Sequence, residues 1–223
     1  MTLNTEDLLN SILESLSRID YIKPSEIPNI DLYMDQVTTF MDSRLKQSKR
    51  NQDDDKILTK TMINNYAKND LLPPPVKKKY SKEHVLLLIF IYYYKGIMSI
   101  NDIQNLLCPI TERFFGKKEG FSLEDLYNEV FSLEPGLVEE MKEDVKKKYL
   151  RAQNTFGEAP TKDQEFLKTF AFICMLSVDV YVKKLMIETL IDSLPKAKPD
   201  EAETKAESKK TESKKDNKKS ETK

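Results

Sequence analysis

The sequence predicts an all-α, mainly helical protein. Apolar residues recur every three or four positions along most of the chain, which is the period of a helix with one buried face. Residues that cap helices precede several of these stripes. With 223 residues, 39% hydrophobic and 33% charged, the chain can bury one good core or two small ones.

The first two helices are expected before residue 46. The first has a stripe that follows the candidate caps Asn4 and Thr5: Leu8, Leu9, Ile12, Leu13, Leu16 and Ile19. Pro24 and Pro28 bound a linker. The second helix has the stripe Tyr33, Met34, Val37, Phe40, Met41 and Leu45. We expect a solvated loop over Gln47–Lys56, because its three aspartates lack the glycine and distal glutamate of a calcium loop.

A short polar helix is predicted over Thr59–Lys68, with Thr59 as its N-cap. Met62, Ile63 and Tyr66 recur at helical spacing, so they should pack inward. This leaves the polar residues outside: Lys60, Thr61, Asn64, Asn65 and Lys68. Asparagine can read a base edge with two hydrogen bonds, and lysine and threonine can reach phosphates.

A cationic turn and a buried helix should follow. Pro73–Pro75 are expected to end the short helix, because a residue before proline is driven out of the helical region. Lys77, Lys78 and Lys79 would form the tip of the turn beside Tyr80, and an apolar helix should occupy Lys82–Lys95. Residues 59–95 hold seven lysines and two acids in a chain of net charge −1. This order is typical of a winged helix-turn-helix, although a solvated surface gives the same pattern.

Residues 58–107 resemble the DNA-binding half of the MerR family. The resemblance rests on the capped helix ending in Leu71-Leu72-Pro73-Pro74, a wing ending in Tyr80-Ser81, the helix Lys82–Lys95 and the segment Gly96–Leu107. Thr61 and Asn64 stand where the family's reading helix has arginines, Asn65 replaces one of its two tyrosines, and the wing is short and lacks its glycine. The resemblance implies the following DNA-binding residues: Thr59, Lys60, Thr61, Asn64, Asn65, Tyr66, Lys68, Lys77, Lys78, Lys79 and Tyr80.

The whole chain, from the segment Ile27–Val37 onward, is more similar still to domain-of-unknown-function family 1836. That family occurs in low-GC Gram-positive bacteria and is regarded as MerR-like, which implies a sequence-specific transcriptional regulator. Its chemistry is not established, so the resemblance adds no residue roles.

Residues 108–194 form a second helical region. We expect a helix over Ser122–Phe131 opened by a capping box, another from Pro135 to about Asn154, and a long one after Thr161. The long helix is apolar on almost every face, and its lysines and Asp179 argue against a bilayer span. Burial within one subunit and a dimer interface both remain open, and we favour the dimer.

Little in the sequence indicates catalysis. The single histidine, His84, is expected on a helix surface, and Cys108 and Cys174 are expected to be small buried residues without a paired spacing. There is no phosphate-binding glycine loop and no hydrolase or zinc-protease motif. We therefore expect no enzyme, no cofactor and no metal. Met1–Leu13 lacks a signal peptide, so we expect a cytoplasmic protein without a membrane role.

The predicted organisation has four parts. Residues 1–26 form a helix and linker, 27–107 the DNA-binding domain, 108–194 the dimerisation or regulatory region, and 195–223 a disordered Lys/Glu/Ser-rich tail with ten lysines and seven acids. We expect a dimeric regulator that binds double-stranded DNA, and the helical region leaves room for an unidentified small-molecule inducer. The alternative is a helical adaptor that does not bind DNA and uses its C-terminal helices to bind a protein.

Overall fold

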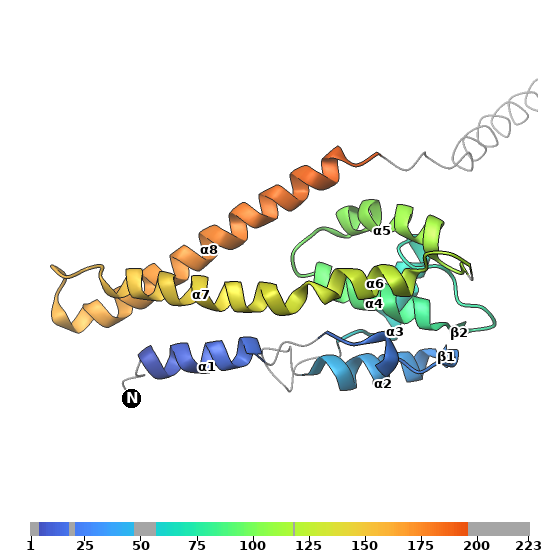
Figure 1. The fold of residues 1–223 in the computed structure, drawn as a ribbon, viewed down its shortest axis with the longest axis horizontal. Coiled ribbons are helices and arrows are strands. Elements are labelled where there is room, and N and C mark those ends of the chain that lie inside the picture. The colour runs from blue at the N-terminus through green and yellow to red at the C-terminus, as the bar shows by residue number, and fades with distance from the viewer. Residues whose placement is uncertain (1–4, 18–20, 47–56, 118, 196–223) are drawn as a thin grey trace, which may run out of the picture. The chain divides into compact units, whose positions relative to one another are not determined.

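The computed structural model describes residues 5–17, 21–46, 57–117 and 119–195, and these are mainly helical, as predicted (Figure 1). In chain order the elements are α1 (Thr5–Ser17), the 3-10 helix η1 (Pro24–Glu26), β1 (Leu32–Tyr33), α2 (Met34–Leu45), α3 (Lys60–Lys68), β2 (Lys79–Tyr80), α4 (Lys82–Tyr94), α5 (Ile100–Phe114), α6 (Leu123–Ser132), α7 (Glu134–Gln153) and α8 (Thr161–Ser193). All of them belong to one compact unit. The predicted loop Gln47–Lys56, the candidate cap Asn4 and the predicted tail after Pro195 lie outside the described residues.

The main core is built around α4. Every side chain from His84 to Ile91 is buried, and α2, α3, α5 and α6 pack around this helix. Leu123 and Tyr127 of α6 are completely buried in the same core, and the Tyr127 hydroxyl donates a hydrogen bond of 2.8 Å to the Ile22 carbonyl. The core therefore crosses residue 107, where the sequence suggested a domain boundary.

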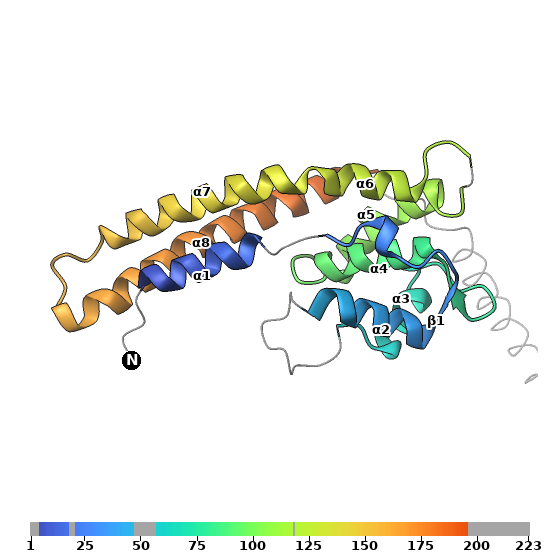
Figure 2. The same ribbon diagram turned by 60° about the horizontal axis from the view of Figure 1, so that its bottom comes forward.

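A second, smaller core lies between α1, α7 and α8. It contains Leu9, Val145, Ala152 and Phe172. Figure 2 shows α7 and α8 running side by side, with α1 along them. An ion pair of 2.6 Å between the Lys148 and Asp179 side chains joins α7 to α8. Because aromatic and aliphatic side chains fill only one side of α8 here, its outer side stays exposed to solvent.

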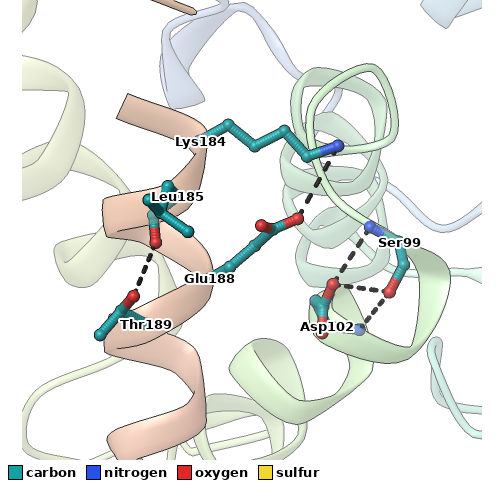
Figure 3. A network of polar contacts seen from close by, with 6 residues as sticks. All are labelled: Ser99, Asp102, Lys184, Leu185, Glu188 and Thr189. Carbon is teal, nitrogen blue, oxygen red and sulfur yellow. Dashed lines mark hydrogen bonds and ion pairs between the residues drawn. The ribbon is translucent and has the colours of Figure 1, made fainter. Parts of the chain in front are cut away.

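The C-terminal part of α8 returns to the main core. Ile191 is buried there and Ile187 packs against it. Figure 3 shows Lys184 and Glu188, joined by an ion pair of 3.7 Å, pointing from α8 toward the first turn of α5, where Asp102 bonds to Ser99. One continuous helix thus contributes to both cores.

The expected burial of both cysteines is wrong. Cys174 is exposed rather than buried, and Cys108 is only half-buried, because both lie on helix faces that no other described element covers completely. The small antiparallel sheet, in which Leu32 pairs with Tyr80 and Tyr33 with Lys79, was not predicted at all. Among the described residues, no helix is long and apolar enough to cross a membrane.

Candidate nucleic-acid interface

The sequence predicted α3 correctly as a capped helix with one polar face. The Thr59 hydroxyl accepts a hydrogen bond of 3.1 Å from the Met62 amide, which satisfies one of the free amides of the first turn. Ile63 and Tyr66 are buried against the main core. The opposite face is exposed, and it carries Thr61, Asn64, Asn65 and Lys68.

The end of α3 differs from the prediction. The helix stops at Lys68, before the prolines are reached, because Asp70 adopts a left-handed conformation with φ 53°. The amides of Leu71 and Leu72 then donate to the Tyr66 carbonyl at 2.9 and 3.2 Å, which closes the last turn. Leu71 and Leu72 are buried, so this turn anchors the chain before Pro73.

The cationic turn after the prolines is a two-residue β-hairpin. Val76 and Lys79 exchange backbone hydrogen bonds of 3.1 and 2.9 Å, and Lys77 and Lys78 form the loop between them. Both loop residues have positive φ, 51° and 64°, which is the conformation of the tight hairpin turn that asparagine and glycine normally occupy. Lys77 and Lys78 are exposed, so two lysines form the tip.

The start of α2 brings α3 and the hairpin close to each other. Lys60 at the start of α3 forms an ion pair with Asp35, and the Lys79 ammonium group lies 5.2 Å from the centre of the Tyr33 ring. Tyr33 and Asp35 are only two residues apart, so α3 and the hairpin both meet the first turn of α2. The polar helix and the cationic tip therefore belong to one local surface.

Several candidate residues have structural roles instead. Tyr66 and Tyr80 are buried, with 7% and 2% of their surface exposed, and burial raises the pKa of both phenols. They support α3 and β2 from within and do not present their rings to a ligand. Lys79 is half-buried, and Lys60 is engaged by Asp35. The exposed candidates are Lys60, in its ion pair with Asp35, and Thr61, Asn64, Asn65, Lys68, Lys77 and Lys78.

Two more lysines of this charged segment are used in packing. Lys82 pairs with Glu124 of α6 at 2.8 Å. The Lys95 ammonium group donates to the Ile57 carbonyl at 2.9 Å, and burial lowers its pKa. Some lysines of this segment therefore serve packing, and only the others place positive charge in solvent near α3 and the hairpin.

His84, expected on the surface, is instead buried with 2% of its surface exposed. Its ring packs edge-on against Tyr80 at 5.5 Å and Phe115 at 4.8 Å, measured between ring centres. Its Nδ1 atom accepts a hydrogen bond of 3.0 Å from the Ser81 amide, so it acts as the third residue of a capping box. This burial could not be predicted from the local pattern, because Phe115 reaches the ring from just beyond the C-terminal end of α5.

Residues 22–130 match the model of a protein family described as "Domain of unknown function (DUF1836)". The matched region runs from Ile22, two residues before η1, into α6, and it contains α3, the hairpin and α4. No curated protein and no solved structure matches the chain.

Proposed function

We propose that this protein is a sequence-specific DNA-binding transcriptional regulator with a MerR-like winged helix-turn-helix. In this proposal α2 and α3 form the helix-turn-helix, α3 enters the major groove, and the Val76–Lys79 hairpin is the wing. The observation that carries the proposal is the pairing of an exposed amide-bearing helix face with a two-lysine tip, both held by the first turn of α2.

The two parts of this surface have different chemistry. Asn64 and Asn65 can each form two hydrogen bonds with an adenine edge, which is how asparagine distinguishes bases in the major groove. Lys77 and Lys78 carry full charges at an exposed hairpin tip. Lysines in such a position neutralise DNA phosphates whatever the base sequence is. The helix would select the site and the hairpin would add affinity that depends on salt.

The position of the lysines also supports a binding role for the hairpin. A non-glycine residue in the left-handed region costs about 1 kcal/mol or more. Both tip positions of this hairpin bear that cost. Lysine there does not stabilise the turn, so its charge is the remaining reason for its presence.

The proposal is tested by recovering the genomic DNA fragments that the purified protein retains. One enriched sequence motif is expected, and uniform recovery without a motif would reject sequence-specific binding. The motif then serves as the probe for the variants below.

The wing is tested by the double substitution Lys77→Glu and Lys78→Glu, which leaves the Lys79 contact with Tyr33 intact. Affinity should fall for the motif and for scrambled DNA alike, and the slope of log affinity against log salt should flatten by up to about 2, since each phosphate contact contributes roughly 0.9. The matched control is Lys146→Glu with Lys147→Glu on α7, which changes the net charge equally. An equal effect of both pairs would mean that only overall charge matters.

The adaptor alternative keeps one observation in its favour, which is the exposed apolar surface of α8. An adaptor would use that surface for a different protein and would retain no DNA motif. The two functions are therefore separated by the fragment recovery and by the identity of the molecule that covers α8.

A further inference from the structure

An exposed ion pair lies at the start of α3, on the surface proposed to meet DNA. The Lys60 ammonium group contacts the Asp35 carboxylate of α2, and 58% of the lysine and 73% of the aspartate side chain are exposed. Lys68, Lys77 and Lys78 are the other exposed lysines of this surface, and no ion pair joins any of them to a described acid. Because a carboxylate repels phosphates, Asp35 must have a role here other than binding the DNA backbone.

The stability of the subunit does not explain the pair. Ion pairs between exposed side chains contribute little to stability, because water screens the charges and both side chains lose freedom. The helices α2 and α3 already meet in the main core, where Val37, Met41 and Ile63 are completely buried. The Asp35 and Lys60 side chains can therefore be changed without loss of the fold.

Lys60 lies on the same side of α3 as a candidate reading residue. Lys60 and Asn64 are four positions apart, so they follow each other along one side of the helix with a rise of about 6 Å. The N-terminal residues of a recognition helix are those that contact base edges in the major groove. A helix that places Asn64 over one base therefore places Lys60 and its carboxylate partner over a base pair within about two steps of it.

The ion pair presents hydrogen-bond donors beside an acceptor. The ammonium group of lysine only donates, and the carboxylate of aspartate only accepts. In the major groove a guanine–cytosine pair presents the complementary order, because guanine N7 and O6 accept and cytosine N4 donates. Guanine O6 and cytosine N4 are hydrogen-bonded to each other, so they lie about 2.9 Å apart. An ammonium group and a carboxylate in contact match this separation.

We propose that Asp35 and Lys60 together read one guanine–cytosine pair of the target site, a role that rests on the proposed function. The Lys60 ammonium group donates to guanine N7 and O6, and the Asp35 carboxylate accepts from cytosine N4. Asp35 has a second effect, because its charge repels phosphates and so keeps Lys60 from binding the backbone of unrelated DNA. Asp35 is thereby a specificity-determining residue of this surface, in addition to Asn64 and Asn65.

The four possible base pairs should bind in a fixed order. A thymine–adenine pair with thymine facing Lys60 keeps an acceptor and a donor in the same places, but it offers a methyl group in place of guanine N7. The reversed pairs, cytosine–guanine and adenine–thymine, set a donor against the ammonium group and an acceptor against the carboxylate. Guanine–cytosine should therefore bind best, thymine–adenine next, and the two reversed pairs worst.

The order is tested on the motif recovered with the wild-type protein. Each base pair of the motif is reversed in turn, and affinity is measured at one salt concentration. Reversal of one guanine–cytosine pair, within about two steps of the position that Asn64→Ala affects, should weaken wild-type binding about tenfold or more, as a mismatched base pair does. For Asp35→Ala the same reversal should cost less than about threefold, because a flexible lysine alone can follow guanine to the other strand.

Lys60 is tested by two substitutions on the same DNA. Lys60→Ala should lose the preference for guanine and should bind all DNA more weakly, because the Asp35 carboxylate is left without its partner. Lys60→Arg should keep the preference, because arginine also donates to guanine N7 and O6. Equal loss in both variants would contradict hydrogen bonding to guanine.

A salt titration on scrambled DNA separates reading from a purely structural role. Asp35→Ala frees Lys60 for phosphates, so affinity should rise about threefold, which is the repulsion of two unit charges about 6 Å apart in water. The slope of log affinity against log salt should steepen by about 0.9. A pair that only joined α2 to α3 would lower the affinity on removal. Glu143→Ala removes the same charge from an exposed ion pair with Lys146 on α7, and this matched control should leave affinity and slope unchanged.

Failure of this reading can be told apart from failure of the proposed function. Recovery of no motif rejects sequence-specific binding and the reading by Asp35 and Lys60 with it. A motif that the wild-type protein binds, but in which no reversal distinguishes the wild type from Asp35→Ala, overturns the reading and leaves the proposed function standing. A motif without a guanine–cytosine pair near the position that Asn64→Ala affects has the same meaning.

Discussion

Replacing His84 with glutamine should remove a pH dependence of stability that the wild-type protein has below pH 6.5. The Ser81 amide donates its hydrogen bond to Nδ1, so the neutral ring carries its proton on Nε2. Protonation would place a second N–H against the Ser81 N–H and would charge a ring enclosed by Tyr80 and Phe115. Burial lowers the pKa of His84, and the carbonyls of Pro74 and Pro73 oppose this in part.

The size of the effect follows from one proton. The unfolded chain protonates His84 near pH 6.5, whereas the folded chain does so at lower pH. Between these two pKa values the unfolded state binds up to one more proton, so the free energy of unfolding falls by as much as about 1.4 kcal/mol for each unit of pH decrease. The stabilising contribution is complete above pH 6.5 and is lost as the pH falls toward the folded pKa.

The assay is urea unfolding followed by circular dichroism at several values from pH 7.5 to pH 5. His84 is the only histidine of the chain, and glutamine is a common residue at this position of a capping box. Burial raises the pKa of the neighbouring Glu83, so the contribution of Glu83 to the free energy of unfolding changes with pH in the opposite direction. That trend is common to both proteins, so the difference between them isolates His84. Parallel stability curves for wild type and His84→Gln would refute the buried neutral ring.

Four further substitutions test the candidate interface and the fold around it. Lys78→Gly should raise the free energy of unfolding by about 1 kcal/mol, because glycine tolerates φ 64°, and should weaken DNA binding by removing a charge; unchanged stability would contradict the turn conformation. Ser99→Ala should destabilise the protein by about 1 kcal/mol in urea unfolding, because the Ser99 hydroxyl caps α5 by accepting from the Asp102 amide at 3.1 Å, and a loss below a few tenths would deny the cap this role. Asn64→Ala and Asn65→Ala, assayed on the selected motif and on scrambled DNA at one salt concentration, should lose about 1–3 kcal/mol of discrimination each; an unchanged ratio for both would remove α3 as the reader and favour the adaptor.

The helices could be predicted because their determinants are local. Ser122 and Asp125 form the capping box expected for α6, with the Ser122 hydroxyl accepting from the Asp125 amide at 3.2 Å. Pro135 lies in the first turn of α7, as expected for a residue without an amide hydrogen. The exposed face of α3 followed from its spacing of apolar residues in the same way.

Features that depend on contacts between distant residues were missed. The strand β1 has two residues and exists only because Leu32 pairs with Tyr80, which no local pattern reveals. The end of α3 was attributed to the prolines, but Asp70 ends it by adopting the left-handed conformation that aspartate tolerates better than most residues. In the candidate site, the number of lysines is visible in the sequence. Their partners are not, because Lys82 pairs with Glu124 of α6 and Lys95 donates to the Ile57 carbonyl before α3.

The path of α8 links the two halves of the molecule. A helix is stiff over its 33 residues, so its outer face near Cys174 and its buried Ile191 keep a fixed relation to each other. Ile191 lies in the same core as Ile63 and Tyr66, the residues that hold α3 from within. A partner that fixes the middle of α8 would therefore also fix the orientation of the surface that carries Asn64 and Asn65. A symmetric pair of such surfaces is what a two-fold DNA site requires, so a second copy of the chain bound at α8 would hold two reading helices in a fixed relation.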